Sequence, residues 1–223
     1  AQLRVWEEIK DDLVAKTPMR RLLQGDVGSG KTLVGALAAL HAKSNGWQTA
    51  FLCPTEILAE QHFSSFKGWF QSMGVHAQLL TGSTKAKDRK TLIKDLAEGK
   101  IDILIGTHAI FQLGVEFKNL GLTVIDEQHR FGVHQRFSML EKGGLENQSP
   151  HQLIMTATPI PRTLAMTVYG SLETSVIDEL PPGRNPVKTS SRPDSFREKV
   201  IKRVEEVCLT GQRAYWVCTL IED

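Results

Sequence analysis

The stretch QGDVGSGKT (residues 24–32) places three glycines between an apolar run and a helical pattern. Gly25, Gly30, Lys31 and Thr32 satisfy the spacing G-x-x-x-x-G-K-[ST] of a phosphate-binding loop. The glycines let backbone N–H groups curl around phosphate oxygens, and the following helix directs its positive N-terminal end at them. A plain glycine turn would explain the glycines but not the Lys-Thr pair. The stretch therefore predicts a nucleotide phosphate site between a strand and a helix.

Around this loop, helical periodicity and short β-branched runs alternate, which is typical of a parallel sheet with helices on both faces. We expect helices near 2–16, 31–44, 55–72, 84–98 and 194–210. We expect strands at 20–26, 49–54, 77–82, 102–107, 122–127, 152–158 and 174–180. Buried parallel strands end in polar or turn-forming residues, as these runs do, and ligands bind at that edge of open α/β sheets. The sequence therefore predicts an α/β fold with its site along the carboxyl edge.

Composition excludes several classes of protein. With 223 residues, 41% of them hydrophobic, the chain is long enough to bury one large core. The net charge of +2 is too small to identify a nucleic-acid binder. Cys53, Cys208 and Cys218 are far apart, which argues against a disulfide framework or a zinc site and favours a reducing cytoplasm. No run of about 18 apolar residues is present, so we expect no membrane contact and no signal peptide.

A boundary is expected at ELPPGRNPVKT (residues 179–189), where three prolines and a glycine interrupt the pattern. The segments on either side are a first domain at 1–179, a linker at 180–190 and the start of a second domain at 191–223. This last segment combines an amphipathic helix with an expected strand, RAYWVCTLI (residues 213–221). Both ends of the chain look like cuts within a longer protein.

The run LTVIDEQHR (residues 122–130) supplies the partners that a phosphate site needs for hydrolysis. Asp126 is expected to bind Mg²⁺ together with the Thr32 hydroxyl, and Glu127 to orient and deprotonate the attacking water. Lys31 is expected to contact the β- and γ-phosphates of the bound nucleotide. Adjacent carboxylates on a strand point to opposite sides, so we expect the Asp-Glu pair where the strand gives way to a loop. Lys31, Asp126 and Glu127 are thus the expected catalytic residues.

The series of motifs resembles helicase superfamily two. DEQH (126–129) is similar to its DExH box, and PTEILAEQH (54–62), TGS (81–83), GTHA (106–109) and TAT (156–158) match its other motifs in order. The longer segments that resemble the RecG family of bacterial ATP-dependent DNA helicases are GDVGSGKT, IDILIGTHAIFQ, DEQHRFGVHQR, MTATPIPRTLAMTVYG and IDELPPGRNPVKT. Together they extend over essentially the whole chain. The bacterial transcription-repair coupling translocases are the nearest alternative, but Gln128 and IDELPPGR favour RecG.

The resemblance implies a RecA-like P-loop NTPase domain, the first of two motor domains. ATP and Mg²⁺ would be the cofactors, and hydrolysis would drive remodelling of branched or forked DNA in recombination and repair. The partners would be that DNA and, from the same full-length chain, the second motor domain and a fork-recognition domain. An arginine finger from the second motor domain would complete the site. Because no later arginine motif is present, the 223-residue chain is expected to be nearly inactive alone. An inert nucleotide- and DNA-binding fragment, or an NTPase with other substrates, remain alternatives.

The resemblance also assigns residues to the nucleotide. Gln2 is similar to the glutamine that reads the adenine base, although a lone glutamine at this position would otherwise be a solvated side chain. The expected nucleotide-binding residues are Gln2, Gly25, Asp26, Val27, Gly28, Ser29, Gly30, Lys31 and Thr32. Thr156 and Thr158 would sense the γ-phosphate from a strand between the P-loop strand and the Asp-Glu strand. His129 would join that relay or make a structural hydrogen bond.

A further group of residues would hold the DNA backbone without reading its sequence. Thr55, Gly82, Thr107 and His108 follow successive strands, where hydroxyls and loop N–H groups can contact phosphates. Taken singly, each is an ordinary helix cap or turn residue, and their ordered recurrence supports the assignment. Arg162 lies in a segment shared with the coupling translocases, and motor coupling and DNA contact both remain open for it.

Overall fold

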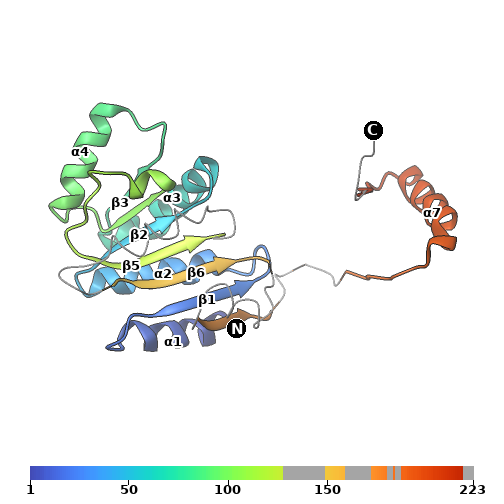
Figure 1. The fold of residues 1–223 in the computed structure, drawn as a ribbon, viewed down its shortest axis with the longest axis horizontal. Helices are drawn as coiled ribbons and strands as arrows, with labels where there is room; N and C mark the ends of the chain where they lie inside the picture. Colours follow the sequence, from blue (N-terminus) through green and yellow to red (C-terminus); the bar gives the residue numbers. More distant parts are fainter. Residues whose placement is uncertain (128–148, 159–171, 180–182, 184–186, 218–223) are drawn as a thin grey trace. The chain divides into compact units, whose positions relative to one another are not determined.

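The computed structural model describes residues 1–127, 149–158, 172–179, 183 and 187–217. The chain divides into two compact units, residues 1–182 and 183–223 (Figure 1). The division lies within the segment expected to be a linker. That residues 191–223 begin a second motor domain stays a prediction.

From α1 to β5 the larger unit alternates helices and strands along the chain, and β6 and β7 follow (Figure 1). Its elements are α1 (Gln2–Leu13), β1 (Arg20–Gly25), α2 (Lys31–Ser44), β2 (Gln48–Leu52), α3 (Glu56–Phe70), the 3₁₀ helix η1 (Gln71–Met73), β3 (Ala77–Leu80), α4 (Ala86–Ala97), β4 (Ile103–Gly106), the 3₁₀ helix η2 (His108–Phe111), β5 (Leu120–Asp126), β6 (His151–Thr156) and β7 (Glu173–Ile177). The smaller unit contains the 3₁₀ helix η4 (Asp194–Phe196) and α7 (Arg197–Leu209). All five expected helices and all seven expected strands of the sheet are therefore confirmed.

The end of helix α1 and the last expected strand differ from the expectation. Helix α1 ends at Leu13 rather than near residue 16, and it could not have continued past Thr17, because the residue before Pro18 is disfavoured in helical conformation. The strand expected at 213–221 is wrong for residues 213–217, which form none, while 218–223 lie outside the described residues. An isolated strand has no hydrogen-bonding neighbour to stabilise it, and the described part of the smaller unit offers no other strand.

The seven strands form one sheet in the order β3-β4-β2-β5-β6-β1-β7. Every pairing between neighbours is parallel. Strand β6 lies between β1 and β5, as expected, with Gln24 opposite Thr156 and Asp126 opposite Met155. The carboxyl ends of the P-loop strand, the TAT strand and the Asp-Glu strand therefore meet at one edge.

The sheet separates two apolar clusters because successive side chains of a strand point to opposite faces. Leu23 and Phe51 join one cluster with buried residues of α1, α2 and α3. Leu22 and Leu52 join the other with buried residues of α4 and η2. Helices thus cover both faces, which confirms the predicted fold class. Among the described residues, none of the helices combines the length and the apolar character needed to cross a membrane.

Candidate nucleotide site and adjoining loops

The loop between β1 and α2 adopts a backbone that depends on glycine. Gly28 and Gly30 have φ values of +81° and +94°, a region that residues with a side chain rarely adopt. At Gly25, an added Cβ would lie 2.6 Å from Ser29 Oγ. That Ser29 hydroxyl is buried and has no hydrogen-bond partner among the described residues. A tight glycine loop with a buried, unpartnered hydroxyl fits a site that receives phosphate oxygens.

Lys31 places a partly desolvated positive charge at this loop. Its side chain lies inside the loop, where Nζ donates to Gly25 O at 2.8 Å and to Asp26 O at 3.0 Å, and the residue is only 9% exposed. Burial lowers the pKa of the ammonium group, while the negative charges of Glu127, Asp126 and Asp26 oppose that shift. Phosphate oxygens are the acceptors that such an ammonium group binds well.

Gln2 is brought to the same loop from a different helix. Its Nε2 donates to Ser29 O at 2.7 Å, across 27 residues of sequence. An added Cβ at Gly30 would lie 2.2 Å from Gln2 Nε2, so the glycine makes room for the glutamine. The structure therefore places Gln2 beside the loop, and its reading of adenine stays a prediction. Of the other expected nucleotide residues, Val27 and Gly28 are exposed, and Thr32 lies half-buried in the first turn of α2.

Asp126 and Glu127 lie at the end of β5, as expected. Asp126 is the last strand residue, and Glu127 has a φ of +50°, which is uncommon for a residue with a side chain. The Glu127 carboxylate accepts hydrogen bonds from Thr156 Oγ1 at 3.2 Å and from Ala157 N at 3.0 Å. Thr158 N in turn donates to Thr156 Oγ1 at 3.1 Å. Glu127 and two of the expected coupling residues, Thr156 and Thr158, thus belong to one hydrogen-bonded group.

Asp126 has a partner that the sequence analysis missed. His62 Nε2 lies 2.9 Å from Asp126 Oδ2, and both side chains are 12% exposed. Ala59, His62 and Phe66 have the spacing of one helix face, and Ala59 and Phe66 are buried. The histidine in this apolar stripe was a signal in the sequence, but the stripe does not show that its partner is Asp126, 64 residues further along the chain.

A hydroxyl and a carboxylate, from Thr32 and Asp126, are available for Mg²⁺. Such hard oxygen ligands are what Mg²⁺ prefers, with water and substrate phosphates completing its shell. The donor chemistry of these two residues therefore fits the expected ion.

The residues expected to contact DNA follow β2, β3 and β4, which form the other half of the sheet. Thr55 caps α3 and accepts from Leu58 N at 3.4 Å. Gly82 and His108 are exposed. Thr107 is only 3% exposed, and its hydroxyl has no partner among the described residues. These positions lie just beyond the carboxyl ends of β2, β3 and β4, beside the nucleotide half of the same edge.

Three further residues, His129, Arg162 and Gln128 of the expected DExH box, lie outside the described residues. Their expected roles remain predictions.

Comparison with known proteins defines the class first. The family model for the DEAD/DEAH box helicases matches residues 1–167, more than half of the chain. The chain belongs to the DEAD/DEAH box helicase family.

Within this family, the resemblance to RecG is confirmed. The chain is 57% identical over 224 residues to the ATP-dependent DNA helicase RecG of Escherichia coli (strain K12). It is 52% identical over 223 residues to RecG of Aquifex aeolicus (strain VF5). These alignments include the whole chain but only 32% and 28% of the respective relatives, so the chain spans about a third of their length.

Solved structures agree with this relationship. A structure of RecG bound to a three-way DNA junction matches with a TM-score of 0.74 and 43% identity, over 94% of this chain and 28% of that chain. The yeast protein Dbp5 of S. cerevisiae matches with a TM-score of 0.57 at 18% identity, over 78% of this chain and 47% of that chain, which supports the fold alone.

Proposed function

We propose that this chain is the ATP-hydrolysing motor domain of a RecG-type helicase that remodels branched or forked DNA in recombination and repair. The observation that carries the proposal is the hydrogen-bonded group of Glu127, Thr156 and Ala157 at the sheet edge that also presents Lys31 and Asp126. RecG relatives that match the whole chain support the DNA substrate. As a DNA-acting protein of this kind, it would work in the bacterial cytoplasm.

In this proposal, each residue of the nucleotide site has a defined task. Lys31 turns from the carbonyl oxygens of its own loop to the β- and γ-phosphates of ATP. Thr32 and Asp126 hold Mg²⁺, which neutralises phosphate charge when bound. Glu127 orients the attacking water and accepts its proton. Gln2 faces the adenine base from the N-terminal turn of α1.

The hydrogen bonds of Glu127 also suggest how ATP hydrolysis could change the position of the neighbouring segment 156–158. Both carboxylate oxygens have donors in the segment 156–158, so a movement of Glu127 on loss of the γ-phosphate would displace that segment. Thr156, Thr158 and His129 are the proposed coupling residues. Thr55, Gly82, Thr107 and His108 are the proposed DNA-backbone contacts, and Arg162 serves coupling or DNA contact. The second motor domain and a fork-recognition domain of the full-length protein are the proposed partners.

The nucleotide part of the proposal is tested by binding. A fluorescent ATP analogue with Mg²⁺ is titrated into the parent chain, Lys31→Ala and Lys10→Ala, an exposed lysine of α1 that serves as the control. We expect Lys31→Ala to abolish binding while its circular dichroism spectrum stays that of the parent. Equal binding by the parent and Lys31→Ala would refute the assignment of the P-loop.

The motor part is tested by turnover of the full-length protein with and without three-way junction DNA. We expect DNA to stimulate phosphate release, and the 223-residue chain alone to show almost none, because a missing arginine finger costs about 10³–10⁵ in rate. Nucleotide binding without hydrolysis in the full-length protein would favour the binding-module alternative.

A further inference from the structure

Helix α3 holds an imidazole against the carboxylate that is expected to bind Mg²⁺. His62 Nε2 donates to Asp126 Oδ2, since an ionised carboxylate can only accept, and the two atoms are 2.9 Å apart. Only 12% of each side chain is exposed, so water competes little for this bond. No role was assigned to His62 by the sequence motifs.

The imidazole is itself held in place. Its ring contacts the ring of Phe51 from β2, with a centroid distance of 5.1 Å and an interplanar angle of 56°. Phe51 is fully buried and also contacts Phe66, one turn further along α3, at 5.0 Å. The ring of His62 is therefore fixed by the core on one side of the sheet.

The beginning of α3 is fixed as well. Thr55 caps the helix, and the Glu56 carboxylate accepts from Ser83 Oγ at 2.8 Å and from Ser83 N at 3.3 Å. The helix that carries His62 thus has its first turn bound to the loop after β3. A donor on such a rigid element can orient a ligand more exactly than one on a free loop.

Asp126 needs such an orienting partner. Its backbone is held by the sheet opposite Met155, but this does not determine the direction of the carboxylate. Asp126 and Glu127 both attract the Lys31 ammonium electrostatically. A carboxylate that could rotate would turn toward Lys31 and neutralise charge meant for phosphate.

We infer that His62 is a positioning residue, which fixes the Asp126 carboxylate in the orientation that receives Mg²⁺. This inference rests on the proposed nucleotide site and adds a residue to it. Donors that orient metal-binding groups commonly contribute 10–100-fold, as an order of magnitude, to metal affinity. The alternative is a histidine that only fills the core beside Phe51, and packing alone would then account for it.

Four variants separate these roles. His62→Phe keeps a ring against Phe51 but removes the donor. His62→Gln keeps an amide N–H at about the reach of Nε2, whereas His62→Asn is one methylene shorter. His41→Phe is the matched control, because His41 makes a comparable ring contact with Trp6, at 5.9 Å, away from Asp126.

The measurement is the Mg²⁺ concentration at which the affinity for a fluorescent ATP analogue reaches its half-maximal increase. We expect His62→Phe and His62→Asn to raise this midpoint by about tenfold or more, with the Mg²⁺-free affinity unchanged. His62→Gln and His41→Phe should stay near the parent midpoint. If His62→Phe does not fold, the comparison of Gln with Asn decides.

Midpoints equal to the parent in both His62→Phe and His62→Asn would overturn the inference. Equal losses in His62→Gln and His62→Asn would overturn it too, because the position of the donor would then not matter. Lys31→Ala in the same titration distinguishes this failure from that of the proposed function. If Lys31→Ala binds nucleotide like the parent, both proposals fail, whereas Lys31-dependent binding with unchanged His62 variants removes this inference alone.

Discussion

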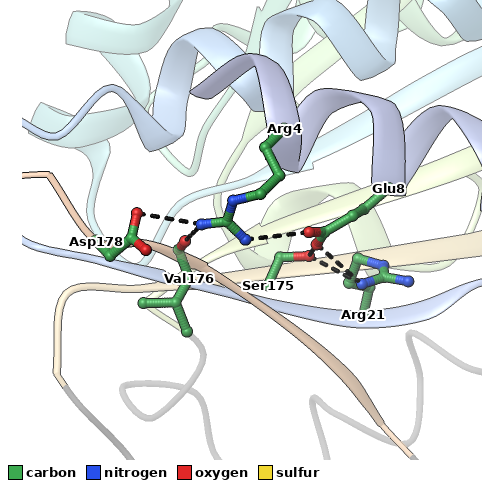
Figure 2. Close-up of polar contacts among 6 residues, drawn as sticks. All are labelled: Arg4, Glu8, Arg21, Ser175, Val176 and Asp178. Carbon is green, nitrogen blue, oxygen red and sulfur yellow. Dashed lines mark hydrogen bonds and ion pairs between the residues drawn. The ribbon is translucent and has the colours of Figure 1, made fainter. Parts of the chain in front are cut away.

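Arg21, which links helix α1 to the sheet through hydrogen bonds and ion pairs, provides a direct test of stability. Figure 2 shows Arg21 of β1 in contact with both Glu8 of α1 and Ser175 of β7. Its Nε also donates to Asp12 Oδ2 at 2.7 Å, its Nη1 donates to Ser175 Oγ at 2.9 Å, and Glu8 Oε2 lies 3.6 Å away. Only 10% of the Arg21 side chain is exposed. Arg21→Met would keep most of the volume and remove all of these contacts.

The stability lost in Arg21→Met depends on how exposed the partners of Arg21 are to solvent. Removing one member of a buried ion pair costs about 3–5 kcal/mol, and hydrogen bonds to charged groups contribute about 1.5–3 kcal/mol each. Glu8 and Asp12 are 33% and 28% exposed, so water can replace part of what Arg21 provides. We therefore expect Arg21→Met to lower the free energy of unfolding by about 2–3 kcal/mol. For a domain of this size, that lowers Tm by roughly 4–12 °C.

The assay is urea unfolding followed by circular dichroism, with thermal unfolding as a second measurement. Arg20→Met is the matched control, because Arg20 is the exposed neighbour of Arg21 in the same strand, and its cost should stay within about 0.5 kcal/mol. The reasoning fails if Arg21→Met also stays within about 0.5 kcal/mol of the parent, or if both variants cost the same.

Four further predictions concern the site. Glu127→Gln in the full-length protein should bind Mg-nucleotide like the parent but release phosphate about 10²–10⁴-fold more slowly, and unchanged turnover would place the base elsewhere. Gly30→Ala should weaken nucleotide binding in calorimetry, because the new Cβ would lie 2.2 Å from Gln2 Nε2. In the control Gly46→Ala, the glycine has a similar φ of +80° but open space around it, so this variant should lose stability without losing nucleotide affinity. Burial lowers the pKa of Lys31, so the folded protein loses this proton at a lower pH than the unfolded chain, in which the pKa is near 10.5. Between the folded pKa and 10.5 the unfolded state therefore binds more protons than the folded state. The free energy of unfolding of the parent, relative to that of Lys31→Met, should rise with pH across this range in urea titrations. DNA binding measured by fluorescence anisotropy should show no base preference and fall steeply with salt, and a strong sequence preference would contradict backbone contacts.

The elements of the fold and the glycine-rich loop between β1 and α2 could be predicted because their signals are local. The period of apolar residues determines whether a segment forms a helix or a strand, and Gly30 carries a positive φ that few other residues allow. The Asp-Glu pair was expected at the end of a strand for the same kind of reason, and β5 ends at Asp126. The strand expected at 213–221 failed at residues 213–217 because a strand depends on a neighbour as well as on its own sequence.

The contacts that build the site were decided by the tertiary structure. Gln2 reaches Ser29 across 27 residues, Glu127 and Thr156 meet across 29, and His62 meets Asp126 across 64. No local pattern encodes such pairs, because they depend on the order of strands in the sheet and on how α1 and α3 pack against it. The sequence alone predicted which residues would carry the chemistry of a DExH-box ATPase. Only the packing of helices on the sheet, driven by burial of their apolar faces, decided which side chains contact those residues.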